Sequence, residues 1–121
     1  MNTKDIAKKL VDYCKNGKIE EAYKELYAED AVSKEMEGVP NGVIKGKASH
    51  LEAFKEWQNS IIEVHEDYTS DPLVAYGYFA VRMMMDVTFK ERGRQKFDEI
   101  CLYKVVNDKI TEAHFFYHIP M

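Results

Sequence analysis

The first half of the chain carries apolar residues at the three- to four-residue spacing of amphipathic helices. Thr3 is suited to cap the first helix, and Asn16-Gly17 is suited to end it. The third helix could begin at Ser49, with Glu52 in capping-box position, or a turn earlier at Lys47. Three stripes result, and they comprise Ile6, Ala7, Leu10, Val11 and Cys14; Ile19, Ala22, Tyr23, Leu26 and Tyr27; and Leu51, Phe54, Trp57, Ile61 and Ile62.

The second half changes to the two-residue period of β-strands. A short extended segment over Asp30–Glu37 and a Gly- and Pro-rich loop precede this change. Four strands are predicted, over Val64–Leu73, Tyr76–Lys90, Lys96–Val106 and Ile110–Ile119. The second of these has six alternating apolar positions, which indicate a strand that lies on a hydrophobic core: Phe79, Val81, Met83, Met85, Val87 and Phe89.

One position in the third predicted strand breaks the apolar pattern. Alternate residues of a strand share a face, so Glu99 lies on the same face as Phe97, Cys101, Tyr103 and Val105. A carboxylate on an apolar face needs a partner, water in a cavity, or a proton. Each of these outcomes favours a pocket at Glu99 over plain packing.

The last two predicted strands are apolar on both faces. Ile100, Leu102 and Val106 lie opposite the face that carries Cys101, and Phe116 lies opposite its two neighbours. A sheet covered by helices on one side would leave these side chains in water, so the pattern predicts a homodimer through the outer sheet face.

Composition narrows the class of protein. The 121 residues form one expected domain, residues 1–121, with a net charge of −4 from 17 basic and 21 acidic residues. The nearest approach to a basic cluster flanks Gly93 in a predicted hairpin, which indicates solvated turn charges and no nucleic-acid partner. Its members are Lys90, Arg92, Arg94 and Lys96.

The two cysteines, Cys14 and Cys101, form no CxxC motif and indicate neither a disulfide framework nor a zinc site. The N-terminus has no apolar signal core. No run of apolar residues in the sequence is long enough to span a membrane. We therefore expect a cytoplasmic protein with no membrane partner, no metal and no cofactor.

Three motifs resemble those of SnoaL-like proteins in the NTF2-like superfamily. They are Gly17-Lys-Ile-Glu-Glu-Ala22, Leu26-Tyr-Ala-Glu-Asp-Ala-Val32 and Asp108-Lys-Ile-Thr-Glu-Ala-His-Phe-Phe-Tyr117. The resemblance covers nearly the whole chain. It implies an α+β cone in which three N-terminal helices pack on a curved antiparallel or mixed sheet, close a deep pocket, and leave the outer sheet face for dimerisation. Because this superfamily hosts isomerases, cyclases, dehydratases, hydrolases and non-catalytic proteins, the fold alone assigns no chemistry.

Comparison with ketosteroid isomerases of the superfamily implies roles for individual positions. Their carboxylate base matches Glu35, which would share a face with Ser33. Their protonated acid matches Cys101, and a thiol is a poor substitute as a hydrogen-bond donor. Their helix tyrosine matches Leu10, with Tyr13 nearly one turn further on. Two of three roles are missing, so steroid isomerisation is not expected.

The remaining carboxylate, Glu99, could pair with Glu35 as an acid and a base for proton transfer, or it could meet an arginine, a tyrosine hydroxyl or water. Glu35 could equally be a solvated loop acid. Among the histidines, His114 and His118 are expected on the outer face and His50 exposed at a helix start, whereas His65 has no assigned face.

The predicted pocket binds a small, mainly apolar molecule. The function is either carboxylate-assisted proton transfer of the isomerase, cyclase or lyase type by Glu35 and Glu99, or non-catalytic ligand binding or protein interaction by a dimer. The other predicted pocket residues are Tyr13, Tyr23, Phe54, Trp57, Met83, Met85, Cys101, Tyr103, Phe115 and Tyr117. The methionines could equally be core filler.

Overall fold

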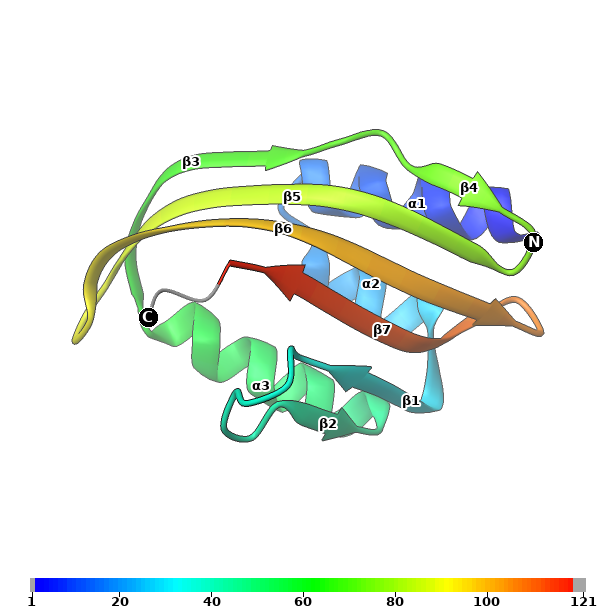
Figure 1. Ribbon diagram of the computed structural model, residues 1–121, viewed down its shortest axis with the longest axis horizontal. Helices are drawn as coiled ribbons and strands as arrows, with labels where there is room; N and C mark the ends of the chain where they lie inside the picture. Colours follow the sequence, from blue (N-terminus) through cyan, green and yellow to red (C-terminus); the bar gives the residue numbers. More distant parts are fainter. Residues whose placement is uncertain (1, 119–121) are drawn as a thin grey trace.

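A computed structural model describes residues 2–118, which form three helices and seven strands (Figure 1). In chain order these are α1 (Thr3–Lys15), α2 (Ile19–Leu26), β1 (Tyr27–Lys34), β2 (Val43–Lys45), α3 (Lys47–Asn59), β3 (Ile61–Thr69), β4 (Leu73–Ala75), β5 (Tyr78–Phe89), β6 (Gly93–Val106) and β7 (Lys109–Tyr117).

Local chemistry explains the helix boundaries. Asn2, and not Thr3, caps α1, and its side chain forms a reciprocal capping box with Asp5. The third helix begins at Lys47, the earlier of the two predicted starts. Its predicted stripe was wrong at the last two positions, because the helix ends before Ile61 and Ile62, which begin β3.

The strands form one mixed sheet in the order β2-β1-β7-β6-β5-β3, with β4 also pairing with β5. The β1–β7 pair is parallel and the other pairs are antiparallel. The strand predicted over Val64–Leu73 is wrong in extent, because it starts earlier and breaks at residues 70–72 into β3 and β4. The short β2 lies in the segment predicted as a loop, and Ile119 of the last predicted strand lies outside the described residues.

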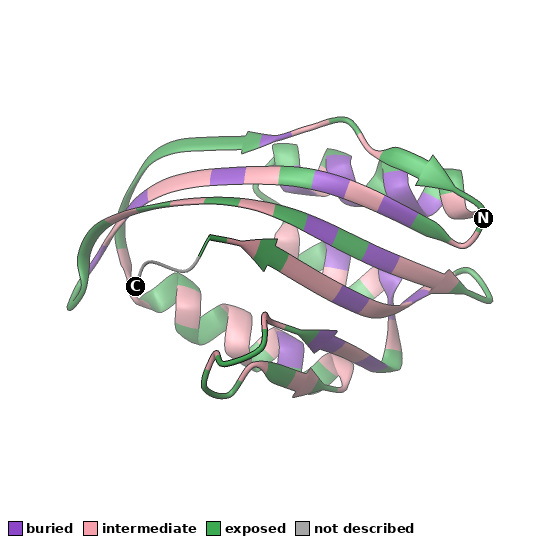
Figure 2. Ribbon diagram, viewed as in Figure 1, coloured by how far each residue is buried: buried purple, intermediate pink, exposed green. Residues whose placement is uncertain are grey.

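The sheet curves around the helices, which lie on one of its faces (Figure 1). Buried positions alternate along β6 and along both ends of β5, as the two-residue period predicts (Figure 2). The middle of β5 departs from this period, because Met84 is buried and its neighbours Met83 and Met85 are only half-buried. The core joins the inner faces of α1 and α2 to this side of the sheet, and its largest fully buried side chains are Phe79, Phe89, Ile6, Leu26 and Ile110.

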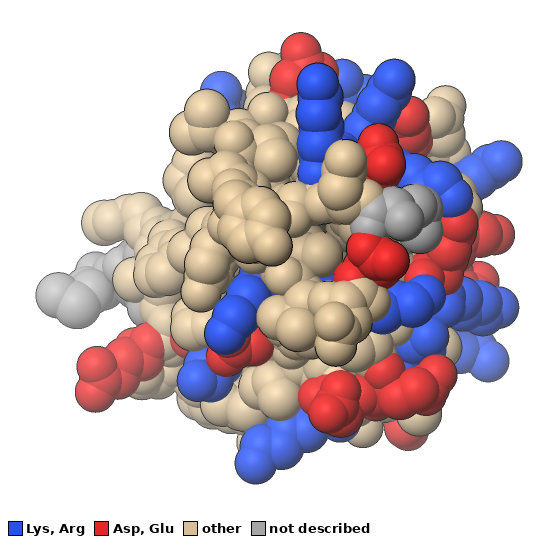
Figure 3. Space-filling model, turned by 90° about the vertical axis from the view of Figure 1, so that its right-hand side faces the viewer, with Lys and Arg blue, Asp and Glu red and all other residues tan. Residues whose placement is uncertain are grey.

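The opposite sheet face remains partly apolar and exposed. Ile100, Leu102 and Phe116 are 47%, 37% and 46% exposed, and they lie on adjacent strands because Ile100 pairs with Phe116. At the end of the molecule seen in Figure 3, positive and negative side chains are interspersed, and no patch of one sign dominates. No helix among residues 2–118 is long and apolar enough to cross a membrane.

Candidate functional site

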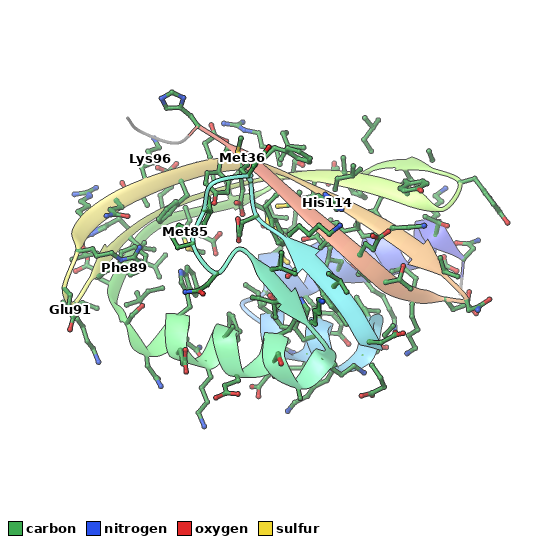
Figure 4. The ribbon with its side chains drawn as sticks, turned by 60° about the horizontal axis from the view of Figure 1, so that its bottom comes forward. Met36, Met85, Phe89, Glu91, Lys96 and His114 are labelled. Carbon is green, nitrogen blue, oxygen red and sulfur yellow. The ribbon has the colours of Figure 1, made fainter. Side chains whose placement is uncertain are left out.

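A cavity of about 430 Å³ lies between the helices and the inner sheet face. Its volume falls within the range of small-molecule sites. Ten of the twelve side chains predicted for the pocket line it: Glu35, Glu99, Tyr23, Phe54, Trp57, Met83, Met85, Tyr103, Phe115 and Tyr117. In Figure 4, Met85 points into the space between the sheet and α3.

The β-strand register brings Glu99 and Glu35 to one wall of the cavity. Glu99 on β6 pairs with Met83 on β5 and Tyr117 on β7. Glu35 follows β1, where its backbone N–H donates to the carbonyl of Gly42 at 2.7 Å. Burial, followed by the nearby charge of Glu35, raises the pKa of Glu99 from 4.5 to about 7. Glu99 therefore exchanges its proton near neutral pH.

The third residue of this wall, Tyr117, links the two carboxyl groups electrostatically. Burial, followed by a hydrogen bond with the Glu35 carboxylate, raises the pKa of Tyr117 to about 12. The backbone N–H of Tyr117 lies 3.1 Å from the Sδ of Met36, in the loop that follows β1. Figure 4 shows Met36 where this loop meets the end of the sheet. The Met36 contact thus joins the segment that carries Glu35 to the strand that carries Tyr117.

Two predicted pocket residues, Cys101 and Tyr13, do not line the cavity. Cys101 is fully buried in the core, and its thiol contacts Oε1 of Glu99 at 3.6 Å. Tyr13 turns to the helix surface, where its hydroxyl donates to Glu25. Leu10, which the resemblance matches to the isomerase tyrosine, does line the cavity and contributes only apolar surface.

A buried polar pair, Ser33 and His50, also lines the cavity. The prediction that His50 is exposed is wrong, because α3 begins early enough to put the first-turn His50 on its inner face, where it is only 3% exposed. The spacing of His50, Phe54 and Trp57, at i, i+4 and i+7, was the sequence signal that could have revealed this shared face.

The lining of the cavity is acidic. Asp67 on β3, which the sequence analysis did not select, lines it with Glu35 and Glu99, whereas no lysine or arginine among residues 2–118 does. None of the three acids forms an ion pair with the described residues. Burial raises the pKa of Asp67. An adjoining hollow of about 330 Å³ shares Asp67 with the cavity and is also lined by Lys15, which pairs with Asp71 at 3.0 Å.

The other candidate ligands for metals are dispersed. His65 lies between Glu63 and the hydroxyl of Thr88, at 3.0 and 2.7 Å. His114 stacks on Phe116 on the outer sheet face, as predicted, and His118 is exposed after β7. Within residues 2–118, no group of three or more histidine, cysteine, aspartate or glutamate side chains is placed to hold a metal ion.

The chain has the α+β fold of NTF2-like proteins. The SnoaL-like domain profile matches residues 1–117, so the chain belongs to the SnoaL-like family. A candidate SnoaL-like polyketide cyclase from Mesorhizobium loti is 36% identical to this chain and superposes on it with a TM-score of 0.90. The match covers 97% of this chain and 100% of that one.

More distant structures share the fold. An NTF2-like protein from Burkholderia thailandensis is 12% identical with a TM-score of 0.81, over 98% of this chain and 92% of that one. A candidate isomerase from Bacillus subtilis is 18% identical with a TM-score of 0.68, over 96% and 86% of the two chains. Comparison with functionally curated proteins found no match.

Proposed function

We propose that this chain is a small-molecule enzyme of the isomerase, cyclase or lyase type, in which Glu35 and Glu99 move a proton on a mainly apolar ligand. The observation that supports this most is that the two carboxyl groups line one cavity, where burial and Glu35 raise the pKa of Glu99 to about 7. A general acid or base works best when its pKa lies near the working pH.

The two carboxyl groups would act in sequence. Ionised Glu35 takes a proton from carbon beside a carbonyl group, and protonated Glu99 donates a hydrogen bond to the oxygen on which negative charge develops. Aromatic walls from Tyr23, Phe54 and Trp57 would hold the apolar body of the ligand. The resemblance matches Cys101 to the acid of steroid isomerases, and in our proposal Glu99 takes this role from one inward position earlier on β6.

Hydrogen exchange tests this proposal without knowledge of the natural substrate. Small apolar ketones such as cyclohexanone and 3-cyclohexen-1-one are incubated with the protein in D₂O, and deuterium at the α-carbon is followed by NMR. We expect exchange that is lost in Glu35→Gln and Glu99→Gln and retained in Glu37→Gln, an exposed neighbour. Exchange that survives both cavity substitutions would contradict the proposed roles.

A second candidate function is non-catalytic ligand binding or protein interaction by a homodimer. The exposed apolar side chains Ile100, Leu102 and Phe116 on the outer sheet face favour such an assembly, because a partner would remove them from water. This candidate predicts that ligand binding persists in Glu35→Gln. It also predicts no deuterium exchange at the α-carbon of the ketones in wild type or in any variant. A cytoplasmic, reducing location is part of both proposals, since the buried Cys14 and Cys101 are free thiols.

A further inference from the structure

Ser33 and His50 form a short hydrogen bond inside the cavity. Ser33 on β1 is 4% exposed and His50 on α3 is 3% exposed, and both line the space that the ligand would occupy. The Oγ of Ser33 lies 2.8 Å from Nε2 of His50. The second ring nitrogen, Nδ1, lies 2.6 Å from the carbonyl oxygen of Gly46. The imidazole is therefore held at both ends.

The chemistry of the two partners assigns the direction of these hydrogen bonds. A carbonyl oxygen can only accept, so Nδ1 of His50 carries the proton that is donated to Gly46. In the neutral ring, Nε2 then has a free lone pair and accepts the hydroxyl proton of Ser33. A hydroxyl that donates to an imidazole, which is itself oriented by a third group, is the arrangement that activates a serine nucleophile.

The surroundings supply further requirements of this chemistry. The ring of Tyr27 lies 5.3 Å from the ring of His50, and Tyr23 lies 5.8 Å from it, which restricts motion of the imidazole. Tyr27 is 3% exposed, lines the cavity, and forms no hydroxyl hydrogen bond with residues 2–118. Its hydroxyl group lies close enough to Tyr23, Cys14 and Cys101 to interact with them electrostatically.

We infer that Ser33 and His50 form a nucleophile–base pair that transfers acyl groups from small apolar esters, a second activity beside the proton transfer proposed for Glu35 and Glu99. The ester class follows from the cavity, since its aromatic and methionine walls suit an apolar acyl chain. An ester also carries no charge that the three cavity carboxylates would repel.

The reaction would proceed in two balanced halves. The Oγ of Ser33 forms a bond to the acyl carbon while its proton passes to Nε2 of His50, and the electron pair of the carbonyl double bond moves to the carbonyl oxygen. The bond to the alcohol oxygen then breaks, and the alcohol leaves with the proton from His50. Water attacks the acyl-serine by the same path, which releases a carboxylic acid and restores Ser33. In its ionised form this product is repelled by the cavity acids, so its release is favoured.

Labelling with diisopropyl fluorophosphate tests this inference on the full chain. The Ser33 oxygen would form a bond to phosphorus, the bond to fluorine would break, and the proton would leave with fluoride. We expect one phosphoryl group per chain by intact mass, located at Ser33 by peptide mapping, and hydrolysis of p-nitrophenyl butyrate that this label abolishes. Peptide mapping of the unsubstituted protein makes the result independent of how any variant folds.

Substitutions separate activation by His50 from simple exposure of a hydroxyl group. His50→Gln can accept the hydrogen bond from Ser33 but cannot take its proton, so labelling should slow by about a hundredfold or more. Ser60→Ala is the matched control, because the Ser60 hydroxyl contacts only the Trp57 carbonyl, and labelling should be unchanged.

Three results would overturn the inference: no label on the folded protein, a label on a residue other than Ser33, or an equal labelling rate in His50→Gln. Labelling of urea-unfolded protein at the rate of the folded protein would do the same, because an unfolded chain has no Ser33–His50 contact.

Discussion

Replacement of Glu99 with glutamine tests whether this carboxyl group lies in a poorly solvated cavity beside a second acid. Glutamine keeps the shape of the side chain and removes its ionisation. Burial is the larger cause of the raised pKa of Glu99, the charge of Glu35 is the second, and the contact with the Cys101 thiol acts in the opposite direction. The substitution therefore removes an unfavourable charge from the folded state only.

The magnitude follows from the linkage between proton binding and folding. The pKa of Glu99 rises from 4.5 to about 7 on folding, so the folded state holds the proton more tightly and loses stability as pH rises between these values. Linkage gives a cost of about 1 kcal/mol at pH 5 and about 3 kcal/mol at pH 8 for the ionisation of Glu99. Relative to wild type, Glu99→Gln should therefore gain about 2 kcal/mol in free energy of unfolding between pH 5 and pH 8.

Urea denaturation of both proteins at pH 5, 6, 7 and 8, followed by circular dichroism, measures this change. The matched control is Glu66→Gln, which replaces an exposed glutamate on β3 that does not line the cavity and is measured at the same pH values. A difference between wild type and Glu99→Gln that is the same at pH 5 and pH 8 would refute the reasoning, since it would mean that water solvates Glu99 as it does in the unfolded chain.

Three further predictions concern the ligand, the assembly and the core. By isothermal titration calorimetry, cyclohexanecarboxylate should bind at least tenfold more weakly than cyclohexylmethanol, about 1.4 kcal/mol, because the described cavity wall has three carboxylates and no lysine or arginine. Equal affinities would contradict this. Phe116→Glu should convert a dimer to a monomer in light scattering, and a wild-type monomer at micromolar concentration would rule out the sheet-face dimer. Phe79→Ala should lower the free energy of unfolding by about 3–5 kcal/mol, because Phe79 is 1% exposed and stacks on Tyr103; a loss below about 1 kcal/mol in urea denaturation would contradict this packing.

Much of the fold was predictable from local patterns. Apolar residues at helical spacing identified all three helices, and the alternation along Phe79–Phe89 identified the long central strand, because side-chain direction within one element depends only on its own period. The same rule placed Glu99 on the inner face of β6. Boundaries were less predictable: a break at residues 70–72 divides one predicted strand into β3 and β4, and Ile61 and Ile62 extend a strand and not a helix.

The site depended on distances between elements, which no local period contains. Whether Glu35 and Glu99 share a cavity is decided by the curvature of the sheet and by the parallel pairing of β1 with β7. The contact of His50 with Ser33 likewise joins α3 to β1 across 17 positions of the chain. The amino-acid sequence by itself determined the family, the elements and the inward direction of Glu99. Only the tertiary structure decided which polar groups meet, because packing of the helices against a curved sheet sets their separations.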